Sequence, residues 1–221
     1  MIEVDAGSAY EARMRRRTWM LGGGLLVLSA LLGLGMSELQ GLITGLPFDI
    51  TQVLFWAGAV VFAIGLGRSG SVTARRKLGT GVIVVLAVWQ TVLSSLVWAM
   101  TGAGDASTTG DFSRVAVIST ASEVVALGLA IIAVMQIGRA GVVPKPWNWA
   151  PLWVLAVWVA AQLLPTLLAV GGSSADPTAL NALFGFFSLL KGVAIAFLGV
   201  LAIVLALRPA PGTTVVYGSG E

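Results

Sequence analysis

Residues 114–138 read RVAVISTASEVVALGLAIIAVMQIG, an almost continuous apolar stretch that contains a single carboxylate, Glu123. The stretch is long enough for a helix that crosses the hydrocarbon core of a bilayer, which takes roughly 20 residues. Glu123 lies nine residues after Arg114, which places it roughly 13 Å below the outer end of such a helix. An ionisable side chain at that depth costs about 2.5–3.5 kcal/mol on insertion scales, so we expect it to be paired, buried in a bundle, or functional.

The rest of the 221-residue chain has the same character, with 57% hydrophobic residues, 10% charged residues and a mean hydropathy of +0.93. Soluble domains carry about 25% charged residues. None of the apolar stretches shows the alternation of apolar and polar residues that is typical of strands in a membrane barrel. Helices are then the remaining structure that satisfies the backbone hydrogen bonds in lipid. We therefore predict an all-α, polytopic bundle of six transmembrane helices. The expected spans are residues 19–36, 52–67, 79–100, 115–137, 150–170 and 182–207.

Polar segments flank this transmembrane domain of residues 19–207. Residues 1–18 form a basic N-terminal segment, and residues 208–221 form a tail rich in Pro, Gly, Thr and Ser that we expect to be disordered. Lys and Arg are concentrated in alternate connections, which by the positive-inside rule places both termini in the cytoplasm and the chain in the cell membrane.

Basic residues at the predicted cytoplasmic interface are expected to set the topology, and binding of anionic lipid is the alternative role. Two clusters of four basic residues are too small a surface for nucleic acid, so none is expected as a partner. The expected partners are the lipid bilayer and, beyond it, other membrane subunits or a second copy of the chain. The interface residues are Arg15, Arg16, Arg17, Arg75, Arg76 and Lys77.

The chain contains neither cysteine nor histidine. Their absence excludes disulfides, thiolate metal sites, imidazole-ligated haem and nucleophile–histidine pairs. Glu123 is the one acid or base expected in the apolar core, and no second carboxylate is expected near it in depth. We therefore expect neither an enzyme nor a cofactor nor a metal site.

Lys191 is the natural partner of Glu123, because it lies ten residues into the sixth predicted helix, roughly 15 Å from the outer end. Two amides lie at similar depths in the third and fifth helices. One serine shares the face of Glu123 by i, i+4 spacing, and another lies on a small-residue face next to Lys191. The sequence thus predicts a polar intramembrane site made of Glu123, Lys191, Gln90, Gln162, Ser119 and Ser188.

Two functions are compatible with this polar site. It could bind a small polar solute or a proton, which would make the protein a small transporter or a transporter subunit. Alternatively, Glu123 and Lys191 could form a salt bridge that fixes helix register in a non-catalytic accessory or assembly subunit of a membrane complex. A cavity that is open to one side and reaches the site would favour transport, whereas a dry, closed ion pair would favour the structural role.

Overall fold

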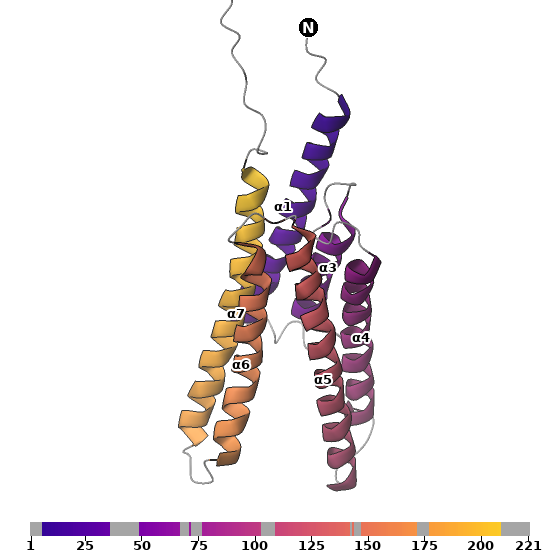
Figure 1. Ribbon diagram of the computed structural model, residues 1–221. Helices are drawn as coiled ribbons and strands as arrows, with labels where there is room; N and C mark the ends of the chain where they lie inside the picture. The colour runs from indigo at the N-terminus through magenta and orange to yellow at the C-terminus, as the bar shows by residue number, and fades with distance from the viewer. Residues whose placement is uncertain are drawn as a thin grey trace, which may run out of the picture.

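The computed structural model describes residues 6–35, 49–66, 71, 77–102, 109–141, 143, 147–171 and 177–208. These residues contain six α-helices, one short 3-10 helix and no strand (Figure 1). The predicted all-α class is confirmed, and each of the six expected stretches coincides largely with a helix, although the stretch 52–67 runs past the end of the second helix at Ile64. The elements are α1 (Ala6–Gly35), α3 (Ile50–Ile64), α4 (Lys77–Gly102), α5 (Thr109–Ala140), η1 (Trp147–Trp149), α6 (Ala150–Gly171) and α7 (Pro177–Leu207).

Four stretches of the described helices are long and apolar enough to cross a membrane: Tyr10–Leu34, Thr120–Ala140, Trp147–Leu164 and Asn181–Leu207. They indicate an integral membrane protein. The helix α3 has 15 residues and is therefore roughly 22 Å long, which is shorter than the ~30 Å hydrocarbon core. The predicted number of six complete spans is thus not confirmed, because α3 does not reach across a bilayer by itself.

The helices pack side by side in a ring. The helix α1 has the most extensive contacts, with α7 on one side and α3 on the other, and α3 continues the ring to α4. Next come α4 against α5 and α6 against α7, and a smaller contact between α5 and α6 closes the ring. Because α1 and α3 occupy only the upper half of the bundle, the α4–α5 and α6–α7 pairs extend below them as two separate arms (Figure 1).

Glycines hold α1 against α7. A Cβ atom added at Gly23 would lie 2.7 Å from the carbonyl oxygen of Gly199, and one added at Gly199 would lie 2.7 Å from the carbonyl oxygen of Gly23. Further along the same pair of helices, Gly192 of α7 faces the side chain of Leu34. Small residues allow this close approach of backbones, which matters in lipid because the apolar surroundings supply no hydrophobic driving force between helices.

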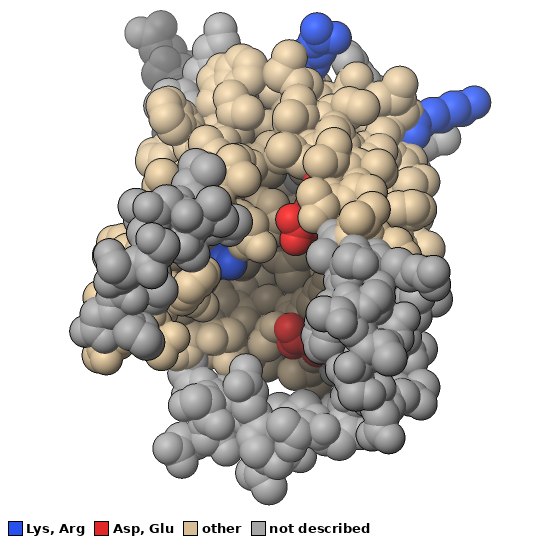
Figure 2. All heavy atoms as spheres, turned by 90° about the horizontal axis from the view of Figure 1, so that it is seen from below, with Lys and Arg blue, Asp and Glu red and all other residues tan. Residues whose placement is uncertain are grey.

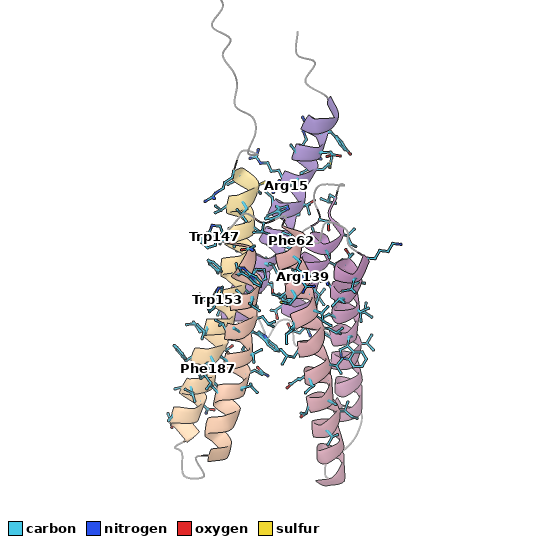
Figure 3. All side chains as sticks on the ribbon, in the orientation of Figure 1. Arg15, Phe62, Arg139, Trp147, Trp153 and Phe187 are labelled. Atoms are coloured by element: carbon cyan, nitrogen blue, oxygen red, sulfur yellow. The ribbon has the colours of Figure 1, made fainter. Side chains whose placement is uncertain are left out.

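The upper half of the ring is filled by aromatic and aliphatic side chains. Trp19 of α1 packs with Phe62 of α3 in a T-shaped arrangement, with ring centroids 6.1 Å apart. Trp147, just before α6, packs against the same cluster, which also contains Val143 and Ala202. Figure 3 shows Phe62 and Trp147 in this upper half. The hydrophobic core of the protein therefore lies at one end. Among the described residues, the lower half has no comparable cluster of packed apolar side chains.

The short helix α3 is capped at both ends. At its start, a carboxylate oxygen of Asp49 accepts hydrogen bonds from the backbone N–H and the hydroxyl of Thr51, at 2.8 and 2.6 Å. At its end, Gly65 adopts a φ of 69°, and Ser71 donates a hydrogen bond to the carbonyl oxygen of Ala63 at 2.6 Å. Because these groups satisfy orphan donors and acceptors at the helix ends, α3 can begin and end inside the bundle.

The described basic residues other than Arg114 and Lys191 gather at one end of the bundle. They lie in the N-terminal parts of α1 and α4 and at the C-terminal ends of α5 and α7, and Figure 3 labels two of them, Arg15 and Arg139. Because α1 begins at Ala6, its arginines are part of the same helix as the first apolar stretch. The residues at this basic end are Arg13, Arg15, Arg16, Arg17, Lys77, Arg139 and Arg208. Arg75, Arg76 and the tail beyond residue 208 lie outside the described residues.

Candidate functional site

A hollow occupies the centre of the ring at the end opposite the basic residues. Figure 2, viewed from this end, shows the hollow with a basic side chain on one wall and acidic side chains across from it. Apart from the residues at the basic end and Glu11 beside them, the charged side chains that the structure describes are Asp49, Glu123 and Lys191. These three residues are therefore the described charged side chains away from the basic end.

Asp49 and Lys191 both lie near the lower end of α1. Near the lower end of α1, Ser29 donates a hydrogen bond of 2.8 Å to a carbonyl oxygen in the first turn of α3, and Asp49 precedes that turn. Five residues further along α1, Leu34 contacts Gly192 of α7, which is the neighbour of Lys191. The lower ends of α1 and α3 thus form the floor of the hollow, and Lys191 stands beside that floor.

Glu123 lies roughly one helical turn above Asp49. Ala133 of α5 packs with Ala63 near the upper end of α3, and the two helices run in the same direction. Glu123 is ten residues before Ala133, roughly 15 Å lower, and Asp49 is fourteen residues before Ala63, roughly 21 Å lower.

Glu123 projects into the centre of the ring. On one side of α5, Ala126 and Ala133 are buried toward α3 and α4. On another side, Gly138 faces η1: a Cβ atom added at Gly138 would lie 3.5 Å from the ring of Trp149. At 100° per residue, Glu123 lies between these two faces. Its side chain is exposed, and it has no hydrogen bond or ion pair with any residue that the structure describes.

The predicted contact between Glu123 and Lys191 is not formed. The Nζ atom of Lys191 instead donates a hydrogen bond of 3.1 Å to Oε1 of Gln162 in α6. No ion pair occurs within the described part of the chain, and α5 and α7 do not pack against one another. The reason is the order of helices in the ring, since α6 separates α5 from α7 on one side and α1, α3 and α4 separate them on the other.

Of the remaining predicted residues, the structure describes the side chains of Gln90 and Ser188. Gln90 is half-buried on the face of α4 that also carries the buried residues Ile83 and Leu86. Ser188 is exposed one turn below Gly192, beyond the lower end of α1. The side chain of Ser119 lies outside the described residues. The structure thus joins Gln162 to Lys191 and leaves the other predicted residues without a described contact to that pair.

Asp49 is the site residue that the sequence analysis missed. No second carboxylate was expected near Glu123 in depth, whereas the contact between α3 and α5 places Asp49 roughly 6 Å lower than Glu123. An Asp two residues before a Thr, directly ahead of an apolar run, is typical of a helix N-cap. That signal would have started the second helix at Ile50, as observed, and would have placed the carboxylate of Asp49 at the end of a helix instead of in solvent.

The hollow brings charges of both signs to one space without neutralising them in an ion pair. The carboxylate of Asp49 is stabilised by its two hydrogen bonds and by the positive end of the α3 dipole. The ammonium of Lys191 is supported by a neutral amide. Among the described residues, no three acidic side chains gather as a metal ion would require. Compared with protein-family models, curated proteins and solved structures, the chain matches none of them.

Proposed function

We propose that this protein resides in the cell membrane and binds a small polar solute in the hollow, as a transporter or as the solute-binding subunit of one. One observation carries this proposal: Glu123 and Lys191 form no ion pair with each other, and the end of the bundle opposite the basic residues is hollow, with charges of both signs around the hollow (Figure 2). A closed ion pair would have supported a purely structural role. Charges that stay unpaired at membrane depth are costly unless water or a solute reaches them.

The direction of the opening follows from the basic residues. Seven described basic residues lie opposite the hollow. They are Arg13, Arg15, Arg16, Arg17, Lys77, Arg139 and Arg208. By the positive-inside rule this end faces the cytoplasm, together with both termini. The hollow then opens to the outside, and a solute enters it from there. The role is non-catalytic in this proposal, because the chain has neither histidine nor cysteine to form a nucleophile–base pair.

The absence of cysteine makes the wetness of the hollow directly testable. Ser188 and Leu189 are adjacent and both exposed, but Ser188 lies on the side of α7 that faces the hollow below α1, whereas Leu189 lies about 100° further round. A charged, membrane-impermeant thiol reagent should therefore label Ser188→Cys in intact cells much faster than Leu189→Cys, because the reactive thiolate forms in water and not in lipid.

Equal and slow labelling of the two variants would show that the hollow is dry. In that case the accessory or assembly subunit, with its other membrane subunits or a second copy as partner, becomes the better hypothesis.

A second experiment uses Gln162→Leu with Trp153→Leu as its control on the outer side of the same helix, where Trp153 is 71% exposed. Only Gln162→Leu should reproduce the cellular phenotype that deletion of the protein produces. The abundance of both variants should be unchanged.

A further inference from the structure

We propose that the solute is a small zwitterion, whose anionic end binds at Lys191 and Gln162 and whose cationic end binds at Glu123. This inference rests on the proposed function and specifies its solute class. It follows from which of the three charges in the hollow already have partners in the protein and which do not.

Asp49 already has partners within the protein. One of its carboxylate oxygens accepts two hydrogen bonds from Thr51, at 2.8 and 2.6 Å, and the residue caps the N-terminus of α3. A helix N-terminus would otherwise attract the anionic part of a ligand. Because the carboxylate of Asp49 occupies that position, an anionic group entering the hollow is directed away from the floor and toward the ammonium of Lys191.

Lys191 and Glu123 keep most of their binding capacity. The ammonium of Lys191 has three donors, and one of them is used in the hydrogen bond to Oε1 of Gln162. Glu123 makes no hydrogen bond or ion pair with the described residues. A ligand carboxylate would complete the coordination of the ammonium, and a ligand ammonium would neutralise Glu123.

The arrangement of helices separates these two groups. Lys191 belongs to the α6–α7 arm and Glu123 to the α4–α5 arm, and α5 and α7 are not packed against each other. A singly charged cation would neutralise Glu123 and leave Lys191 without a counter-charge, and a singly charged anion would do the reverse. A molecule with one charge of each sign satisfies both walls of the hollow at once, so its two ends should face the two arms.

The test uses the purified wild-type protein in lipid nanodiscs and a series of ω-amino acids from glycine to 6-aminohexanoate. Each member is compared with the primary amine and with the carboxylate of the same chain length. At least one ω-amino acid should raise the Tm in a concentration-dependent manner, while its amine and its carboxylate counterparts leave the Tm unchanged. An equal rise with either singly charged counterpart, or no rise with any ω-amino acid, would overturn the inference.

Variants assign the two ends of the ligand. In Lys191→Met the plain amine, and in Glu123→Gln the plain carboxylate, should raise the Tm as much as the zwitterion does. Arg139→Gln, which removes an exposed charge at the basic end, serves as the control and should respond as the wild type does. Labelling of Ser188→Cys separates the two proposals: a wet hollow without a zwitterion response contradicts only the solute class, whereas a dry hollow contradicts the proposed function itself.

Discussion

The contact between α1 and α7 predicts that a single methyl group at Gly199 destabilises the bundle. An added Cβ would lie 2.7 Å from the carbonyl oxygen of Gly23, 2.7 Å from Cγ2 of Val27 and 3.0 Å from the backbone nitrogen of Val27. Two of these three atoms belong to the backbone of α1 and cannot rotate away. In Gly199→Ala the two helices must therefore move apart along the most extensive contact of the ring.

The magnitude follows from two opposing effects. Overpacking of a close contact costs typically about 1–3 kcal/mol, whereas Ala is about 0.5–1 kcal/mol more favourable than Gly within a helix. Gly185 provides the matched control, because it lies on the same helix and nothing is within 4 Å of its added Cβ. The difference between Gly199→Ala and Gly185→Ala therefore isolates the overpacking cost, at about 1–3 kcal/mol.

Thermal unfolding of the purified variants in one detergent measures this difference. For a chain of this size, 1 kcal/mol corresponds to a shift in Tm of roughly 2–4 °C, so Gly199→Ala should melt roughly 2–12 °C below Gly185→Ala. Gly23→Ala and Gly24→Ala form a second pair on α1, because a Cβ at Gly23 would clash with α7 and one at Gly24 would meet nothing within 4 Å. Equal melting temperatures within both pairs would refute the close approach of the two helices.

Three further predictions concern charges and hydrogen bonds. Because Glu123 and Lys191 do not touch, the losses of stability in Glu123→Gln and Lys191→Met should add within about 0.5 kcal/mol in a double-mutant cycle. A coupling energy above about 1 kcal/mol would instead be evidence that the two residues form an ion pair. The fully buried Thr18 hydroxyl accepts a hydrogen bond of 2.9 Å from the backbone N–H of Leu66, so Thr18→Val should lower the free energy of unfolding by about 1–3 kcal/mol, measured by chemical denaturation. An impermeant thiol reagent should label Lys77→Cys only after the cells are permeabilised; labelling in intact cells would reverse the orientation.

The helices themselves were predictable from the sequence. Each of the six expected stretches coincides largely with a helix, because a chain in lipid must satisfy its backbone hydrogen bonds locally, and hydropathy reports where this happens. The start of α3 was encoded as well, in Asp49 and Thr51, but the apolar connection before it concealed the N-cap.

The tertiary structure decided which polar residues meet. Residues at equal depth become partners only if their helices are neighbours, and hydropathy carries no information about lateral order. Here Gly23 and Gly199 bring α1 against α7, and the ring that follows separates α7 from α5. Lys191 therefore binds Gln162 instead of Glu123. The two charges that composition alone would pair face a common hollow instead. The physical reason is the close packing of α1 against α7, which sets the order of helices in the ring.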